Sequence, residues 1–262
     1  MILLSFDTEE FDVPLENGVN IDIDRQVEIS AEGTNRILDC LKANNVRATF
    51  FCTANFALRA KEVMNRIIAE GHEVASHGYY HSSFRVEDLA ESKKTLEQEF
   101  GISVNGYRQA RMMPVSETEI EKAGYKYNSS INPTFIPGRY MNLNKPRRYF
   151  IQEGVLQIPA SVTPWLRFPL FWLSCHNLPM WLYVWLCKRT VNHDGYLNVY
   201  FHPWEFCELN NYKELNIPYI IRNNSGYTLL GRLNRLITSL KAEGREFVTF
   251  TEFIKKNKLH NI

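Results

Sequence analysis

The sequence predicts an α/β barrel of parallel strands, and two observations support this fold class. Short apolar runs of strand length alternate without a break with longer segments of helical periodicity, as in a parallel sheet covered by helices. About seven such units in 262 residues fit a closed barrel better than an open sheet. Because no internal repeat, low-complexity tract or Gly/Ser linker interrupts the chain, residues 1–262 are expected to form one domain.

The first half of the chain contains the more regular elements. Predicted strands cover residues 2–6, 47–52, 73–76 and 106–109, and predicted helices cover residues 31–44, 60–68 and 86–100. Gly71 and Gly101 follow two of these helices, where glycine favours a helix end. Ser116 and Glu119 have capping-box spacing, which predicts a short helix that ends at Gly124.

The second half is less regular. Strands are predicted at residues 154–159, 196–201 and 247–250, an amphipathic helix at 229–240, and a long surface loop at 132–146. Residues 163–187 contain four of the five tryptophans and a single charged residue, Arg167. We treat this aromatic segment as an insertion into the barrel.

Charge and cysteine content exclude several classes of protein. The 30 Lys and Arg residues balance 29 Asp and Glu residues, which argues against a nucleic-acid partner. The first twelve residues lack the basic start and long apolar core of a signal peptide. Five cysteines without CxxC spacing favour a reducing compartment. We therefore expect a cytoplasmic protein.

Polar residues gather where the predicted strands end, which is the catalytic face of a parallel barrel. They are Asp7 and Glu9 after the first strand, His77 and His81 after the third, Arg108 after the fourth, Asn128 after the fifth and His202 after a late one. Two histidines and a carboxylate at this rim would form a three-ligand site with open positions, as in catalytic zinc sites. Asp7 and Glu9 are two residues apart and should point to one side, with Glu10 pointing away.

Each feature alone has an ordinary structural explanation. His77 and His81 are also consistent with solvated histidines in a surface turn. Asp7 and Glu9 are consistent with an acidic loop or a helix cap. An isolated histidine at the position of His202 is more often a hydrogen-bonded core residue than a catalyst.

In combination, these residues form five motifs in a fixed order. The motifs are Ser5-Phe-Asp7-Thr-Glu9-Glu10, Ser76-His77-Gly-Tyr-Tyr-His81-Ser82, Gly106-Tyr107-Arg108, Tyr127-Asn128-Ser-Ser and Phe201-His202-Pro-Trp204-Glu, with an Ala-Thr-Phe-Phe strand at 48–51. From residue 5 to about residue 253, the chain resembles the polysaccharide deacetylase (NodB-homology) family of carbohydrate esterases. This resemblance implies a distorted (β/α) barrel. It also implies a metal-dependent hydrolase that removes an N-acyl group, in the first place acetyl, from an amino sugar of a glycan or glycan precursor.

The resemblance also implies roles for single residues. Asp7 would be the general base, His202 the general acid that protonates the departing amine, and Arg108 would keep Asp7 ionised and oriented. His77, His81 and a carboxylate would hold a divalent ion, in the first place zinc. The ion and a backbone N–H of the third motif would stabilise the oxyanion.

Three positions depart from the family pattern. Thr8 stands where many members have a second aspartate, so we choose Glu9 as the metal carboxylate. Ala110 replaces a proline of the third motif. Asn128 replaces the aspartate that tunes the acid histidine, which predicts a lower pKa for His202 or a weaker enzyme. Glu10, Tyr107, Asn128 and Trp204 are expected to support these groups or contact the substrate.

The aromatic segment 163–187 has three interpretations. It packs over the later strands, or it forms a lid or wall of the substrate groove. In the third, it rests on the inner face of a membrane beside Lys188 and Arg189. Pro179 and neighbouring polar residues make a membrane-spanning helix improbable. The membrane interpretation pairs with a lipid-linked or nucleotide-linked amino-sugar precursor as substrate.

Two other functions stay open on the sequence. One is a metal amidohydrolase that cleaves another C–N bond, in a formamido sugar or a ureide. The other is a catalytically silent glycan-binding homologue, a hypothesis that Thr8, Ala110 and Asn128 keep open.

Overall fold

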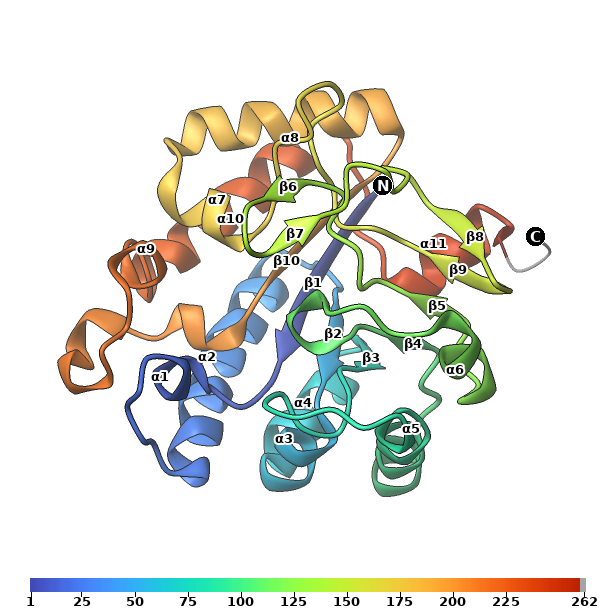
Figure 1. The fold of residues 1–262 in the computed structure, drawn as a ribbon. Coiled ribbons are helices and arrows are strands. Elements are labelled where there is room, and N and C mark those ends of the chain that lie inside the picture. Colours follow the sequence, from blue (N-terminus) through green and yellow to red (C-terminus); the bar gives the residue numbers. More distant parts are fainter. Residues whose placement is uncertain (260–262) are drawn as a thin grey trace.

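The structure, a computed structural model, describes residues 1–259 and contains one curled sheet with helices outside it (Figure 1). The sheet has eight strands in the order β10-β1-β2-β3-β4-β5-β9-β8. The strands are β1 Ile2–Thr8, β2 Thr49–Cys52, β3 Glu73–Ser76, β4 Gly106–Tyr107, β5 Tyr127–Asn128, β8 Phe150–Gln152, β9 Val155–Gln157 and β10 Leu197–Phe201. All neighbouring pairs are parallel except β8 with β9. The predicted fold class, a distorted barrel of about seven parallel strands, is therefore confirmed.

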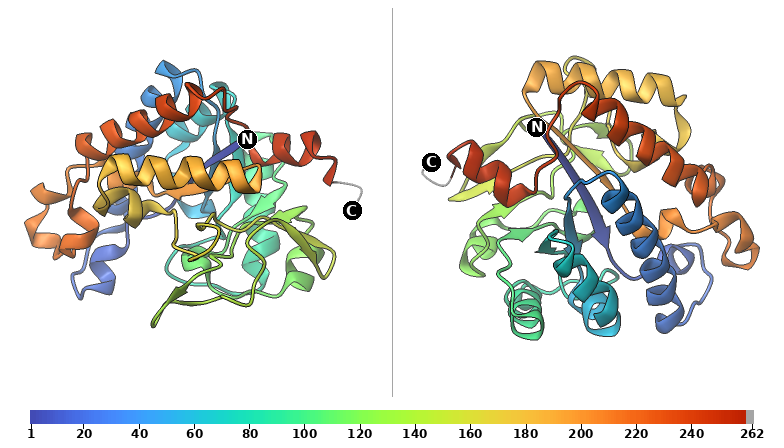
Figure 2. Two further views of the ribbon diagram at one scale, coloured as in Figure 1. Left: turned by 90° about the horizontal axis from the view of Figure 1, so that it is seen from above. Right: turned by 180° about the vertical axis from the view of Figure 1, so that it is seen from behind.

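Helices connect successive parallel strands and cover the outside of the sheet. They are α1 Val13–Glu16, α2 Ile23–Ala43, α3 Ala54–Arg59, α4 Lys61–Ala69, α5 Glu87–Phe100, α6 Glu117–Lys122, α7 Trp172–Asn177, α8 Met180–Asp194, α9 Tyr219–Arg222, α10 Tyr227–Lys241 and α11 Phe250–Lys256. Short 3-10 turns cover Ala110–Met112 (η1), Pro203–Phe206 (η2), Leu209–Asn211 (η3) and Lys213–Leu215 (η4). Seen from behind, α10 lies beside α2 (Figure 2).

The alternation of strand side chains creates two apolar cores. In β1, Ile2, Leu4 and Phe6 face the helices, whereas Leu3 packs with residues of other strands, such as Phe51, inside the barrel. The inner positions change from apolar to polar toward the carboxyl end of β1, where Ser5 and Asp7 follow Leu3. A buried polar rim therefore lies above an apolar barrel floor.

The barrel closes through one residue of β10. The N–H of Asn198 donates to Ser161 Oγ, and the N–H of Ser161 donates back to Asn198 O, both at 2.8 Å. The Asn198 side-chain amide also donates to the carbonyls of Ile158 and Pro159. These contacts take the place of a full strand ladder between β9 and β10.

Three local predictions are wrong. Residues 247–250 do not form a strand: Phe247 makes a single bridge with Ile2, and a reciprocal capping box between Thr249 and Glu252 starts α11 instead. The loop 132–146 contains a hairpin of β6 Phe135–Ile136 and β7 Tyr140–Met141. Ser116 precedes α6, but its side chain makes no capping hydrogen bond within residues 1–259.

Candidate active site

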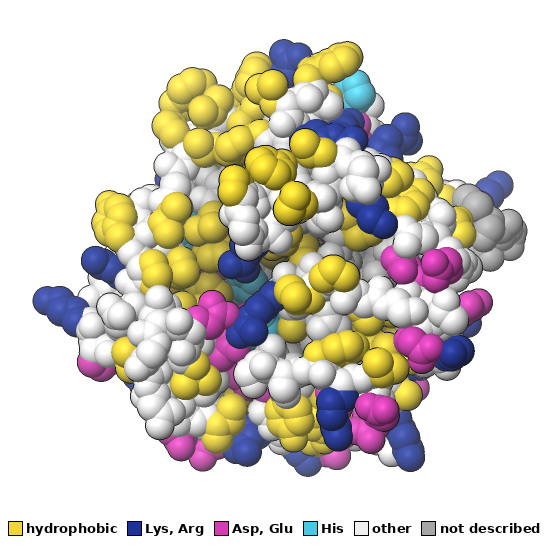
Figure 3. All heavy atoms as spheres, viewed as in Figure 1, with side chains coloured by type: hydrophobic (Ala, Val, Ile, Leu, Met, Phe, Trp, Pro, Cys, Tyr) yellow, Lys and Arg dark blue, Asp and Glu magenta, His cyan; other side chains and the backbone are white. Residues whose placement is uncertain are grey.

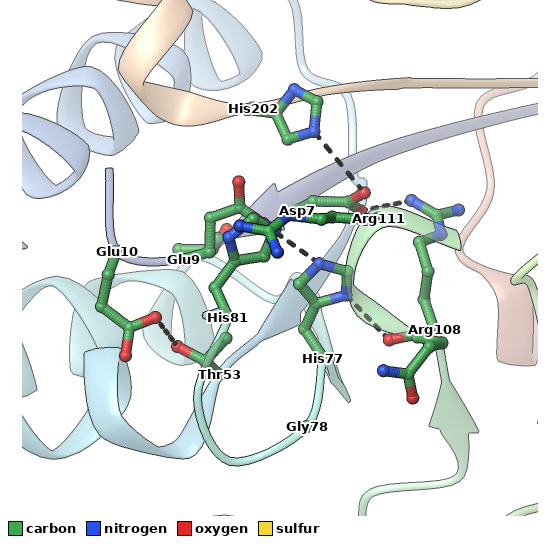
Figure 4. A network of polar contacts seen from close by, with 12 residues as sticks. Asp7, Glu9, Glu10, Thr53, His77, Gly78, His81, Arg108, Arg111 and His202 are labelled. Carbon is green, nitrogen blue, oxygen red and sulfur yellow. Dashed lines mark hydrogen bonds and ion pairs between the residues drawn. The ribbon is translucent and has the colours of Figure 1, made fainter. Parts of the chain in front are cut away.

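Asp7 is the last inward-facing residue of β1, and Arg108 holds it there. Arg108 is fully buried and donates to Asp7 Oδ1, Ser5 Oγ and Ser129 Oγ. Its guanidinium carbon lies 4.0 Å from the centre of the Phe51 ring. Because these contacts fix the guanidinium group, they also fix the Asp7 carboxylate, whose other oxygen, Oδ2, faces His202 (Figure 4).

Glu9, His77 and His81 bring three potential metal ligands together. Glu9 Oε2 lies 3.1 Å from His77 Nε2 and 3.2 Å from His81 Nε2. One ligand atom from each residue lies within 4.8 Å of the other two, and all three side chains are buried. Glu9 Oε2 has no hydrogen-bond partner among residues 1–259. The structure thus places Glu9 at the position that the sequence analysis assigned to the metal carboxylate.

The far side of each histidine ring is anchored by an oxygen atom. His77 Nδ1 lies 2.8 Å from the carbonyl oxygen of Arg108, which can only accept, so this nitrogen carries a proton. His81 Nδ1 lies 2.9 Å from Asp12 Oδ2, and Arg111 pairs with the same carboxylate. Both Nε2 atoms therefore turn toward Glu9, as in metal sites where an outer carboxylate or carbonyl orients the ligand.

Glu9 is oriented in the same way. Its Oε1 accepts a hydrogen bond of 3.2 Å from the indole N–H of Trp204, which leaves Oε2 for the histidines. An oxygen and two imidazole nitrogens that face one another need a positive charge between them. The residues present therefore fit a divalent cation with two nitrogen ligands and one oxygen ligand.

The charges of this cluster fit the same conclusion. Burial raises the pKa of Glu9, but His81, His202 and His77 lower it to about 2. Burial also lowers the pKa of His81, but Glu9 and Asp12 raise it to about 9. The cluster stabilises one positive charge, which a proton supplies in the metal-free protein and a bound cation would supply in its place.

His202 ends β10 and faces Asp7 across the rim. Its Nε2 lies 4.0 Å from Asp7 Oδ2, and its ring stacks on Trp204 with centroids 4.9 Å apart. Its Nδ1 lies 2.6 Å from Glu205 Oε1, which also accepts from the backbone N–H of His202. The other oxygen of Glu205 lies 2.8 Å from Nε2 of the fully buried His176.

The predicted role of Asn128 is wrong. Asn128 faces the outer side of β5, where it bonds to Gln157 and Ser130, and Glu205 supplies the carboxylate beside His202. Burial lowers the pKa of His202, but Glu9, Glu205 and Asp7 raise it above its ordinary value. The lower pKa predicted from the sequence is therefore corrected to a higher one.

The other predicted residues take different places. Glu10 turns away from the cluster and bonds to Thr53 and Asn55. Tyr107 is fully buried on the outer side of β4, and its hydroxyl donates to Gln109. These two residues shape the loops around the site, whereas Trp204 contacts both Glu9 and His202.

Sequence reasoning missed Asp12, His176 and Glu205. A signal for Glu205 was present, because a histidine followed by proline and, three residues on, by glutamate has the spacing of a capping box, and the structure forms one. Asp12 precedes the proline-containing start of α1, a usual place for a capping residue. No sequence pattern pairs His176 with Glu205, because they are 29 residues apart.

These groups open into a pocket of about 250 Å³. Trp172 forms part of its wall and meets the His202 ring edge-on, with centroids 5.1 Å apart. The remaining lining residues include Arg111, Arg139, Tyr140, Leu173, Ile220 and Ile221. A larger cavity of about 740 Å³ lies among β5, β9 and α11, and no histidine of residues 1–259 lines it. The smaller pocket is thus the candidate active site.

Different residues of the aromatic segment 163–187 fit two of the three interpretations, packing over the strands and a wall of the groove. Phe171 and Tyr183 are buried in the outer core, and Trp172 lines the pocket. Trp181 and Trp185 are exposed on the outer side of α8. The structure therefore assigns packing and wall functions to different residues of the segment and leaves its exposed tryptophans to be explained.

Comparison with protein families matches residues 2–126 to the family described as polysaccharide deacetylase. The chain is therefore similar to the polysaccharide deacetylase family over slightly less than half of its length. The matched residues include the first three motifs, with Asp7, Glu9, His77, His81 and Arg108. Among curated relatives, a 50-residue stretch is 44% identical to the peptidoglycan-N-acetylglucosamine deacetylase of Bacillus cereus. Another stretch of 64 residues is 36% identical to an uncharacterised 30.6 kDa protein of Geobacillus stearothermophilus.

These alignments cover only 19% and 24% of this chain and 18% and 24% of the two relatives. Solved structures support the deacetylase fold over nearly the whole chain. A Mycobacterium smegmatis protein provisionally assigned as a polysaccharide deacetylase has a TM-score of 0.64 at 18% identity, covering 98% of this chain and 88% of that one. A PuuE allantoinase has a TM-score of 0.63 at 16% identity, covering 97% and 88%. A pseudoenzyme of Bacillus anthracis has a TM-score of 0.53 at 14% identity, covering 96% and 64%.

Proposed function

We propose that this protein is a metal-dependent hydrolase that removes an N-acyl group, in the first place acetyl, from an amino sugar of a glycan or glycan precursor. One observation carries the proposal. A single small pocket is lined by Asp7, His202, Glu9 and His81, and His77 completes the potential ligand cluster beside Glu9. General base, general acid and a cation site are the groups that hydrolysis of an amide requires.

Each residue has a defined part in this reaction. A divalent ion held by Glu9, His77 and His81 would polarise the acyl carbonyl and lower the pKa of a water molecule. Asp7, fixed by Arg108, accepts the proton of the water whose oxygen joins the acyl carbon. His202 gives its proton to the amide nitrogen as the C–N bond breaks, which yields a carboxylic acid and a free amine.

The raised pKa of His202 suits this role. An acid must carry its proton at the working pH, and a raised pKa keeps a larger fraction of the His202 ring protonated as the pH rises. Glu205 holds Nδ1 of the ring and so directs the opposite nitrogen, Nε2, toward Asp7 and the reacting bond. The oxyanion donor in the third motif remains a prediction.

Activity assays test the assignment of base and acid. Release of acetate or formate is measured from a panel of N-acyl amino sugars and lipid-linked glycans. Asp7→Asn and His202→Ala are each expected to lower kcat by about a hundredfold or more while the protein stays folded. Glu214→Gln, at an exposed position, is the control. Full activity in either site variant would reject the assigned roles.

Metal content tests the ligand set separately from activity. We expect one bound divalent ion per chain by elemental analysis, in the first place zinc, and its loss in Glu9→Gln, His77→Ala and His81→Ala. Glu10→Gln is the matched control, because Glu10 bonds to Thr53 and Asn55 outside the cluster. An unchanged ion content in the three ligand variants would overturn the proposed site.

Two alternatives have their own support among the structural neighbours. The similarity to an allantoinase keeps a ureide or another C–N bond as a candidate, and an assay of ureide hydrolysis separates this reaction from acyl release. The similarity to a pseudoenzyme keeps a second alternative, a catalytically inactive protein that binds glycans. A protein that binds glycans without a stoichiometric metal ion would favour that role. The cytoplasmic location remains a prediction, which cell fractionation tests.

A further inference from the structure

The outer side of α8 is apolar where a surface helix is normally polar. Its buried side includes Tyr183 and Cys187, which pack in the core. The opposite side presents Trp181, Trp185 and Arg189 at intervals of four residues, so they form one stripe. Trp181 is 67% exposed and Trp185 47% exposed. Because neither indole is buried, the core does not explain why tryptophan occurs at these positions.

The turn at residues 163–168 extends this apolar surface. Trp165 and Leu166 at its tip are 83% and 89% exposed. The turn is well fixed: Thr163 and Phe168 bond to each other twice, and Arg167 donates to two backbone carbonyls of the neighbouring hairpin region. A groove of about 310 Å³ separates the turn from α8, lined by Trp165, Leu166, Trp185, Leu186 and Arg189 among others. The structure therefore holds these apolar groups outward in a defined arrangement.

The β6–β7 hairpin continues the same surface toward the active site. Its region exposes Phe135, Met141 and Leu143, and Thr134 bonds to the carbonyl of Arg167 in the turn. We call the exposed set the aromatic face, and it consists of Phe135, Met141, Leu143, Trp165, Leu166, Trp181 and Trp185. Figure 3 shows hydrophobic side chains gathered over α8 and the hairpin, above the hollow in which histidine is visible. Single exposed apolar residues are ordinary, but a contiguous group of this kind marks an interaction site.

The segment that contains most of this surface carries an excess of positive charge. Residues 132–192 contain seven Lys and Arg residues and one acidic residue, Glu153, which leaves 23 basic and 28 acidic residues in the rest of the chain. Arg147 pairs with Asp194 and Lys188 pairs with Glu243. Among residues 1–259, the cations of this segment without such an acidic partner are Arg139, Lys145, Arg148, Arg167 and Arg189. The Arg189 guanidinium lies 5.0 Å from the centre of the Trp185 ring, so charge and aromatic surface occur side by side. The partner of such a surface should be anionic and partly apolar.

We infer that the aromatic face docks on an anionic lipid bilayer. Tryptophan favours the boundary between lipid headgroups and hydrocarbon, and each nearby Lys or Arg adds about 1 kcal/mol of attraction to anionic lipid. A second copy of the chain fits less well, because a symmetric contact would bring two excesses of positive charge together. None of the helices in residues 1–259 could cross a bilayer, so the contact would be peripheral.

The position of the face suggests the substrate. Tyr140 and Arg139 of the hairpin line the catalytic pocket, as does Leu173 of α7, so the pocket opens beside the aromatic face. A docked molecule would receive an amino sugar attached to a lipid anchor directly from the membrane. This last step rests on the proposed function, whereas the lipid contact itself does not.

Vesicle flotation tests the contact with the whole protein. The probes are vesicles of phosphatidylcholine alone and of phosphatidylcholine mixed with phosphatidylglycerol. We expect flotation with the anionic vesicles, weaker flotation with the neutral ones and a decrease as salt is raised. Replacing Trp165 and Leu166 by Ser, or Trp181 and Trp185 by Gln, should lower the bound fraction by about tenfold. The control is Val86→Ser, which removes an apolar side chain that is 48% exposed at the start of α5.

Three results would overturn the inference. They are no flotation with anionic vesicles, equal flotation of the tryptophan variants and wild type, or a dimer in analytical ultracentrifugation that these variants abolish. Hydrolysis of a water-soluble N-acyl amino sugar is measured in parallel. If the variants lose flotation but hydrolyse the soluble substrate as the wild type does, the substitutions affect the membrane contact and not the proposed reaction.

Discussion

At the residue scale, strand alternation decides which polar side chains reach the pocket. Arg108 and Ser129 face the barrel interior, so their neighbours Tyr107 and Asn128 face outward. The motifs predicted the right strand ends, but we assigned a site role to Tyr107 as well as Arg108, and to Asn128 instead of Ser129. Alternation could have removed Tyr107 from the sequence alone, because Arg108 was already expected to face Asp7. Removing Asn128 required the register that pairs it with Tyr107.

Glu205 contributes to the proton affinity of His202. Burial lowers the pKa of His202, but Glu9, Glu205 at Nδ1 and Asp7 raise it, so the protonated acid persists to higher pH. In Glu205→Gln this support is lost and the pKa falls, so the alkaline limb of the kcat/KM profile should move to lower pH. We expect a loss of activity of about 10- to 100-fold at neutral pH. An alkaline limb at the wild-type position would show that Glu205 does not act on His202.

Glu205 and His176 form a fully buried pair behind His202. His176 Nδ1 faces the carbonyl of Asn223, and its Nε2 faces Glu205 Oε2. Breaking this fully buried pair in His176→Phe should cost about 3–5 kcal/mol of unfolding free energy, as measured by urea denaturation.

The surface pair of His193 and Asp194 provides a contrast, because half of the His193 side chain is exposed. His193→Phe should change the unfolding free energy by about 1 kcal/mol or less. Equal losses of unfolding free energy in the two variants would mean that the buried His176 pair stabilises the fold no more than the surface pair does.

At the element scale, a close contact between α2 and η2 positions the His202 segment. A Cβ atom at Gly33 of α2 would lie 1.8 Å from the carbonyl oxygen of Pro203, which directly follows His202. Only glycine permits this approach. The helix was predicted from its apolar spacing, but its first eight residues, 23–30, were missed because the prediction began at residue 31.

Gly33→Ala should therefore separate α2 from η2. We expect a loss of about 1–3 kcal/mol in unfolding free energy by urea denaturation, together with lower kcat because His202 moves with η2. Gly231→Ala is the matched control within α10, where nothing lies within 4 Å of the added carbon. That variant should gain about 0.5–1 kcal/mol. A fully stable and active Gly33→Ala variant would contradict the packing argument.

At the scale of the whole molecule, the sequence predicted the barrel because parallel strands and helices alternate with clear periods. It failed where contacts between distant segments decide the structure. Residues 247–250 look like a strand, yet Thr249 and Glu252 cap a helix there. His176 was noted only as a polar interruption of an apolar run, because its partner Glu205 lies in another element. The periodicity of helices and strands is visible in the local sequence. Pairings between distant residues, such as His176 with Glu205, form only in the folded barrel.

A metal ion at the rim should stabilise the entire fold. Its ligands come from the ends of β1 and β3 and the loop that follows β3, and they form one site only when these segments are correctly packed. Zinc at about one hundred times its dissociation constant should add ~2.7 kcal/mol to the unfolding free energy. Thermal unfolding of the chelated and zinc-loaded protein measures this, and His77→Ala should abolish the difference. An equal zinc response in that variant would place the ion elsewhere.

The closure of the barrel through Asn198 has a consequence for how this fold can change. β10, which carries His202 at its end, is paired along its length with β1 but is joined to the β9 side by a few contacts of one residue. The chain between those contacts and β10 contains the turn, α7 and α8. Trp172 and His176 of α7 support His202 and Glu205, but substitutions in the turn and on the exposed side of α8 can alter what the protein contacts while the acid keeps its position against Asp7. Selectivity and chemistry can thus evolve at separate rates in this molecule.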